Sequence, residues 1–139
     1  VSGCPRNCAE ATCKDIGVVC VDSGYEISVA GAAGMDVKET ELLCKVGTED
    51  EVIEIIAAFV QLYRENARYL HRIYKWVGRV GLDWCRARVV DDLANRKALY
   101  DRFLLSQSVY QADPWAEHAR PATRTNWAAL ADLSLEAAE

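Results

Sequence analysis

The sequence predicts an α+β fold, in which a short helix and a small antiparallel sheet come first and a mainly helical half follows. Residues 16–31 hold two β-branched runs separated by the turn signal Asp22-Ser23-Gly24, a pattern typical of a β-hairpin. Residues 48–69 and 83–106 instead carry apolar side chains at helical spacing. Because the strands precede the helices rather than alternate with them, the pattern favours α+β.

The first predicted element is a short helix over residues 5–14. Pro5 follows Cys4 directly, and proline is well tolerated at the first position of a helix because no N–H is needed there. On such a helix Cys4 and Cys8 lie about one turn apart on the same side. Cys13 falls on the opposite side.

Residues 16–21 and 25–31 are the two strands of the predicted hairpin. The segment AGAAG at residues 30–34 is a loop of small residues, where a backbone can approach another group closely. For residues 35–46 we expect a strand at one or both ends, with a turn or a short helix between them.

The clearest helix signal begins at Thr48, which forms a capping-box pattern with Glu51. We expect this helix to reach Tyr69 or beyond and a second helix to span 83–106, with Gly78 and Gly81 between them. Trp76 and Trp84 indicate a packed corner between helices or, as the alternative, an interface. The predicted domain covers residues 1–110, and residues 111–139 are expected to be a weakly helical or partly disordered tail.

The net charge of −5 argues against general affinity for nucleic acid or an anionic membrane. No apolar run approaches the roughly 20 residues that span a bilayer. An even number of cysteines, six, permits a disulfide framework, but a chain with this much apolar sequence needs no such cross-links. We therefore expect reduced thiols and a cytoplasmic protein, with four cysteines acting as small hydrophobic residues: Cys13, Cys20, Cys44 and Cys85.

The remaining pair, Cys4 and Cys8, forms a C-x3-C motif that can supply two thiolates to one metal group. Structural zinc normally takes four ligands, and a 4Fe–4S cluster takes four cysteines. Neither Cys44 nor Cys85 belongs to a second such pair. We therefore expect the chain to be a fragment that holds half of a metal site.

Several segments together resemble one family over residues 1–115. They are VSGCPRNCAEATCKDIGVV, GYEISVAGAAG, ELLCKV, QLYRENARYL and RKALYDRFLLSQ. The chain is similar to the C-terminal part of the large subunit of bacterial assimilatory NAD(P)H-dependent nitrite reductases, within the siroheme and 4Fe–4S nitrite and sulfite reductases. Many relatives have GGNGG where this chain has AGAAG, so no cofactor contact by an asparagine is carried over there.

The resemblance implies a role for each residue of the motif. Cys4 is a cluster ligand, and Cys8 is a cluster ligand that also binds the siroheme iron. Arg6 and Asn7, by position, are neighbours of the siroheme. No residue is assigned a catalytic role, because the upstream C-x5-C pair and the basic residues that grip the substrate anion in this family are absent.

The resemblance also implies the reaction, a six-electron reduction of nitrite to ammonia. Electrons would come from NAD(P)H through FAD in upstream domains of the same polypeptide, with the small nitrite reductase subunit as a further partner. We expect the isolated chain to be inactive and to self-associate to some extent. The basic stretch from Arg64 to Arg79 is expected to be a solvated face, or alternatively a surface that docks another domain or shields siroheme carboxylates.

Three alternatives stay open. The same cysteines fit a sulfite reductase fragment. A small metal-binding or electron-transfer module, complete in itself, would recruit Cys13 or Cys20 as further ligands. A metal-free docking domain would use the helical half to bind a partner subunit. Bound iron would separate the first two readings from the third.

Overall fold

The computed structural model describes residues 1–110, so the predicted tail at 111–139 lies outside the described residues. Residues 1–104 form one compact unit, and the end of the last helix belongs to a second unit that starts at residue 105. The predicted α+β class is confirmed. Among residues 1–110, no helix is both long enough and apolar enough to cross a membrane.

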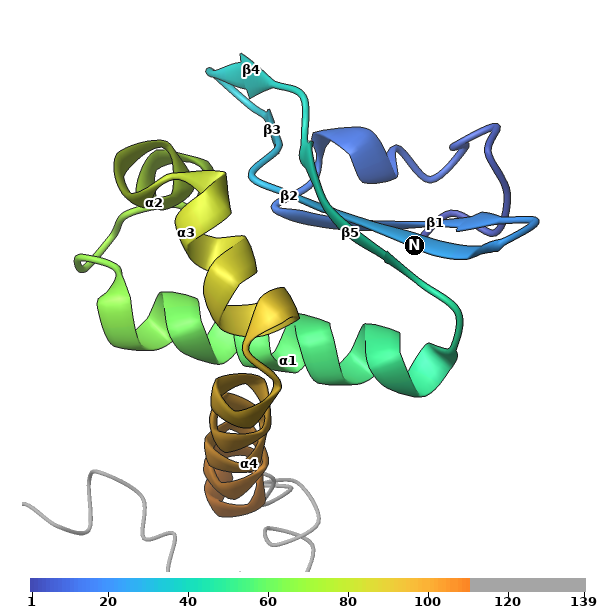
Figure 1. Ribbon diagram of the computed structural model, residues 1–139. Coiled ribbons are helices and arrows are strands. Elements are labelled where there is room, and N and C mark those ends of the chain that lie inside the picture. The colour runs from blue at the N-terminus through green and yellow to red at the C-terminus, as the bar shows by residue number, and fades with distance from the viewer. Residues whose placement is uncertain (111–139) are drawn as a thin grey trace, which may run out of the picture. The chain divides into compact units, whose positions relative to one another are not determined.

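The sheet has three antiparallel strands in the order β1-β2-β5. Strand β1 (Ile16–Val21) and strand β2 (Gly24–Val29) form the predicted hairpin, with Val21 paired to Gly24 at its tip. Strand β5 (Glu41–Val46) pairs with β2, with a bulge between Ile27 and Ser28. A separate two-stranded hairpin joins β3 (Ala32–Ala33) to β4 (Val37–Lys38) and projects from the end of the sheet in Figure 1. The strand expected at the end of residues 35–46 is therefore present.

Helix α1 (Glu49–Asn66) begins with the predicted capping box. The Thr48 hydroxyl accepts from the Glu51 amide at 3.3 Å, and the Glu51 carboxylate accepts from the Thr48 amide at 3.1 Å. The Thr48 hydroxyl also donates to the Glu51 carboxylate at 2.9 Å. This bond, together with those from the Thr48 and Gly47 amides, lowers the pKa of the Glu51 carboxyl because it favours the charged form.

The predicted extension of this helix to Tyr69 is wrong. Ala67 takes an extended conformation, and Leu70 takes a left-handed one with φ 63°. The side chain of Asn66 donates to the Leu62 carbonyl at 2.9 Å, and Arg79 donates to the Asn66 carbonyl at 3.1 Å. Side chains thus satisfy carbonyls that a longer helix would have bonded.

The single helix predicted over 83–106 is also wrong. The structure has α2 (Ile73–Val80), α3 (Leu82–Arg86), a π-helical turn η2 (Ala87–Asp91) and α4 (Leu93–Tyr110). The break falls at Asp92, whose carboxylate accepts from the Asn95 amide at 2.9 Å and so caps the start of α4.

The core lies between the sheet and the helices of residues 1–104. Figure 1 shows α1 beside the sheet, and η2, which continues from α3, packs against α1. Fully buried side chains come from β2, β5 and all five of α1, α2, α3, η2 and α4: Ile27, Val29, Leu43, Ile55, Phe59, Trp76, Val77, Cys85, Val89 and Leu99. Trp76 meets Phe59, Tyr63 and Trp84 edge to face, at 5.7, 5.5 and 6.2 Å between ring centroids. The packed corner predicted for the two tryptophans is therefore present.

Candidate metal-ligand loop

The two motif cysteines lie on a surface loop, residues 3–10, that is held at both ends. On the near side, the Ser2 amide donates to the Val18 carbonyl at 2.8 Å, and the Cys20 amide donates to the Ser2 carbonyl at 2.9 Å. On the far side, Ala11 is fully buried. It begins η1 (Ala11–Cys13), a single 3-10 turn. Strand β1 therefore fixes where the loop leaves and rejoins the fold.

Close backbone packing seats η1 on the sheet. A Cβ atom at Gly17 would lie 2.1 Å from the Ala11 carbonyl oxygen, so only glycine fits there. A Cβ atom at Gly31 would lie 2.5 Å from the Lys14 carbonyl oxygen. The expectation that the AGAAG loop allows a close backbone approach is met at Gly31, which also donates its amide to the Lys14 carbonyl at 3.0 Å.

The helix predicted over residues 5–14 does not form. Residues 4–9 make turns, and only Ala11–Cys13 are helical, as 3-10 rather than α. Asn7 and Glu10 have positive φ angles of 52° and 56°, which an α-helix cannot accommodate. The predicted i, i+4 geometry of Cys4 and Cys8 on one helix face is therefore wrong, and a turn takes its place.

Asn7 organises that turn. Its side-chain oxygen accepts from the Ser2 hydroxyl at 3.0 Å and from the Ala11 amide at 2.7 Å, and its side-chain nitrogen donates to the Thr12 hydroxyl at 2.7 Å. Its own amide donates to the Cys4 carbonyl at 3.1 Å. Asparagine is one of the few non-glycine residues that adopt a left-handed conformation readily, which suits it to this position. Its predicted role as a siroheme neighbour stays a prediction.

Cys4 and Cys8 flank this turn, and both thiols are free and exposed. Arg6, between them, is also exposed. A turn that presents two thiols to the outside, on a backbone held at Ser2 and Ala11, leaves both side chains able to bind a group outside the described residues.

The other cysteines are less accessible. Burial raises the pKa of the Cys44 thiol, and it raises the pKa of Cys85, which is fully buried, to about 11. The Cys13 thiol is half-buried and donates to the Glu10 carbonyl at 3.2 Å, and Cys20 is half-buried in β1. Cys44 and Cys85 thus have the hydrophobic environment predicted for them, and Cys13 and Cys20 have part of it.

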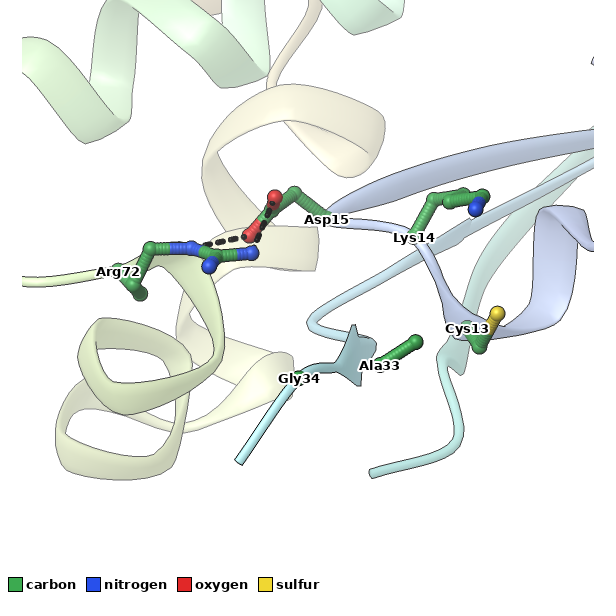
Figure 2. Close-up of a pocket in the computed structure, with 6 residues that line it drawn as sticks. All are labelled: Cys13, Lys14, Asp15, Ala33, Gly34 and Arg72. Carbon is green, nitrogen blue, oxygen red and sulfur yellow. Dashed lines mark hydrogen bonds and ion pairs between the residues drawn. The ribbon is translucent and has the colours of Figure 1, made fainter. Parts of the chain in front are cut away.

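A small pocket lies beside the far end of the loop (Figure 2), with a volume of about 230 Å³. Its lining consists of Cys13, Lys14, Asp15, Ala33, Gly34 and Arg72. Arg72 makes a two-point ion pair with Asp15, at 3.2 and 2.7 Å, which raises the pKa of the guanidinium. Lys14 points away from Arg72 in Figure 2. Sequence reasoning did not single out Asp15, because its partner lies 57 residues away.

The five cations of the basic stretch, Arg64, Arg68, Arg72, Lys75 and Arg79, are all exposed, as expected for a solvated face, but some of them also bond other elements. Arg72 bonds Asp15, Arg79 bonds the end of α1, and Lys75 lies 4.0 Å from the Asp36 carboxylate in the β3–β4 hairpin. Several of these cations therefore tie elements of this unit together.

The donor set fits an iron–sulfur cluster in part. Thiolates are the ligands that such clusters take, and Cys4 and Cys8 offer two in one turn. Within residues 1–110, no three histidine, cysteine or acidic side chains lie close enough together to hold a metal. A cluster at this loop needs two further thiolates from outside the described part of the chain.

Comparison with known proteins supplies the remaining evidence. The family model described as "Nitrite and sulphite reductase 4Fe-4S domain" matches residues 1–97. The chain is 44% identical to nitrite reductase [NAD(P)H] of Bacillus subtilis over 84% of its own length and 14% of that protein's. It is 32% identical to the nitrite reductase (NADH) large subunit of Escherichia coli, over 66% of this chain and 11% of that subunit.

A third relative is an assimilatory-type sulfite reductase of Nitratidesulfovibrio vulgaris, 30% identical over 65% of this chain and 41% of that protein. The chain thus spans about a seventh or less of the nitrite reductases it matches. Because the family model covers well over half of its residues, the chain belongs to the nitrite and sulphite reductase 4Fe-4S domain family.

Proposed function

We propose that this chain is the C-terminal part of the cluster-binding region of an assimilatory nitrite reductase, in which Cys4 and Cys8 supply two of the four cluster ligands. The observation that carries the proposal is the loop of residues 3–10. It belongs to a chain of the 4Fe-4S domain family and presents two free, exposed thiols on a backbone held at Ser2 and Ala11.

In this proposal Cys8 also binds the iron of a siroheme, so that one thiolate joins the two cofactors. The bound cofactors supply the redox chemistry that takes nitrite to ammonia by six electrons. The chain's own residues hold and orient them. Asn7 sets the turn that aims both thiols outward, and its amide and hydroxyl partners keep that turn in one conformation. Arg6 is exposed and available to a cofactor carboxylate.

The remaining parts of the proposal concern the whole enzyme. NAD(P)H and FAD act in other domains of the same polypeptide, which works in the cytoplasm and with the small nitrite reductase subunit. Residues 1–110 form the domain and 111–139 its tail. The isolated chain, with half of the ligand set, does not reduce nitrite. These parts of the proposal are supported by the small share of the related nitrite reductases that this chain spans.

The test uses the full-length polypeptide that contains this chain, purified without oxygen. Iron, acid-labile sulfide and the visible spectrum are measured for the parent, for Cys4→Ser and Cys8→Ser, and for Cys13→Ser. We expect the parent to contain siroheme and a 4Fe–4S cluster and the first two variants to lose the cluster, with Cys8→Ser losing the siroheme as well. Cys13→Ser is the matched control, since serine retains a donor for the Glu10 carbonyl. A colourless or zinc-loaded parent contradicts the proposal.

Sulfite reduction is the second candidate. It is favoured by the similarity to the sulfite reductase of N. vulgaris, of which this chain covers a larger share than of the nitrite reductases. Steady-state rates of the full-length enzyme with each anion decide between the two.

A further inference from the structure

Strand β1 is the outer strand of the three-stranded sheet, and its free edge already carries the start of a further strand. Ser2 pairs with Val19 in parallel orientation, through the Val18 carbonyl and the Cys20 amide. Within residues 1–110, this single bridge is the only pairing on that edge of β1.

The next groups along this edge follow from strand geometry. The N–H and C=O of one residue point to the same side of a strand, and the side alternates from residue to residue. The Val18 carbonyl faces Ser2, so the Val18 amide faces the same free edge of β1. Ile16 lies two residues before Val18, so its carbonyl faces that edge too. A parallel ladder that continues from Ser2 therefore places the residue just before Val1 opposite Gly17. There it would accept from the Val18 amide and donate to the Ile16 carbonyl.

An apolar groove runs beside that edge, between β1 and α1. Its volume is about 360 Å³, and it is lined by Val1, Val18, Val52, Ile53, Ile56, Ala57, Val60 and Phe103. Val1 and Ile53 expose 83% and 57% of their surface. An apolar hollow of this kind, next to an unpaired strand edge, marks an interaction surface.

The two faces of the N-terminal segment differ. The Ser2 side chain is buried and bonds Asn7, whereas Val1 lines the groove. Because successive side chains alternate, the second residue before Val1 would point to the same side as Val1, into the groove against α1.

We propose that the polypeptide leading into Val1 in the parent enzyme runs along β1 as a fourth, parallel strand and fills this groove with its apolar side chains. The inference rests on the proposed function, which makes this chain part of a longer polypeptide. The occupant is identified by continuity with the Ser2–Val19 pairing, by the apolar lining and by the much greater length of the relatives. It follows that the same strand that fills the groove delivers the chain to Cys4, so the ligand loop is held from both sides by β1.

The first test is amide hydrogen exchange of the full-length polypeptide, resolved to single residues. The Cys20 amide, which donates to Ser2, is the internal reference for protection. We expect the Val18 amide to exchange within roughly tenfold of Cys20 and far more slowly than unstructured amides. Exchange of Val18 at the rate of an unstructured amide, with Cys20 protected, overturns the proposal. A charged residue at the second position before Val1 in the parent sequence also overturns it.

The second test compares Ile53→Asp with Val37→Asp in the same polypeptide. Val37 is 83% exposed on the β3–β4 hairpin, away from the groove, and serves as the matched control. We expect Ile53→Asp to speed exchange at Val18 and to lower the unfolding temperature, and Val37→Asp to change neither. Equal behaviour of the two variants overturns the proposal. A second combination of results also overturns the proposal. The Val18 amide is unprotected in the full-length polypeptide, and the 139-residue chain forms a dimer that Ile53→Asp dissociates. In that case a second copy of the chain covers the groove.

Cluster content of the same samples separates this inference from the proposed function. Protection at Val18 without iron or sulfide supports the fourth strand and contradicts the cluster. A full cluster with an unprotected Val18 amide supports the proposed function and contradicts the fourth strand.

Discussion

At the scale of single residues, Asn7 decides the shape of the ligand loop. It combines a left-handed backbone with three side-chain hydrogen bonds, to Ser2, Ala11 and Thr12, and it lies between the two motif cysteines. A residue that looks in the sequence like a candidate cofactor neighbour therefore has a structural role of its own.

Replacing Asn7 tests that role. We expect Asn7→Ala to lower the free energy of unfolding by about 1–3 kcal/mol, since it removes the hydrogen bonds and leaves part-buried partners unpaired. Urea denaturation measures the change. Asn7→Gly retains the backbone freedom and loses only the side-chain bonds, so it should be less destabilising than Asn7→Ala. Equal stability of the parent and Asn7→Ala would show that the loop is held without this residue.

The raised pKa of the Cys85 thiol leads to a prediction of how the free energy of unfolding depends on pH. Burial raises its pKa to about 11 in the folded chain from an ordinary value of 9.0, so above pH 9 the unfolded chain loses this proton first. The unfolded state then binds fewer protons than the native state, and stability falls between about pH 9 and 11, by at most about 1.4 kcal/mol per pH unit.

The measurement is the free energy of unfolding across this pH range for the parent and for Cys85→Ala. The variant is less stable at neutral pH because of the cavity, but its curve should be flatter above pH 9. Parallel curves for the two proteins would rule out a contribution from Cys85.

At the scale of elements, the contact between η1 and β1 fixes the position of the ligand loop, residues 3–10. The loop ends at Ala11, and Ala11 can lie against β1 only because Gly17 has no side chain. The position of the two cysteines thus depends on a glycine in a strand that contains no ligand.

Gly17→Ala should displace η1 and lower the free energy of unfolding by at least about 1–3 kcal/mol, because the new Cβ atom would lie 2.1 Å from a backbone oxygen. Gly78→Ala is the matched control, since that glycine lies inside α2 with nothing within 4 Å of the new atom. There alanine should stabilise by about 0.5–1 kcal/mol. Thermal and urea unfolding of the two variants give the comparison, and similar effects at both positions would contradict the close approach at Gly17.

At the scale of the whole molecule, the open ligand set and the open strand edge lie at the same place. Ser2 leads the chain from the free edge of β1 to Cys4, and the apolar groove lies beside that edge. Helices of the described unit cover one part of the sheet. The free edge of β1 and the ligand loop are left uncovered, and there we propose that the rest of the enzyme attaches. Domain and tail boundaries at residue 110 stay a prediction.

Some features were determined by the sequence alone, because neighbouring residues specify them. The hairpin over 16–29 follows from β-branched runs and a short turn, and the start of α1 follows from Thr48 and Glu51, three residues apart. The C-x3-C motif and its flanking segments were enough to indicate the family, since that information lies in the order of residues.

Other features were decided only by tertiary structure. A turn forms in place of the helix predicted at 5–14. The Asn7 side chain hydrogen-bonds Ser2 and Thr12, and Ala11 packs against Gly17. The Arg72–Asp15 pair and the groove between β1 and α1 join residues far apart in the chain. Local propensity cannot anticipate contacts of this kind, because they form only when the sheet and the helices pack, and their free energy then outweighs that of a short isolated helix.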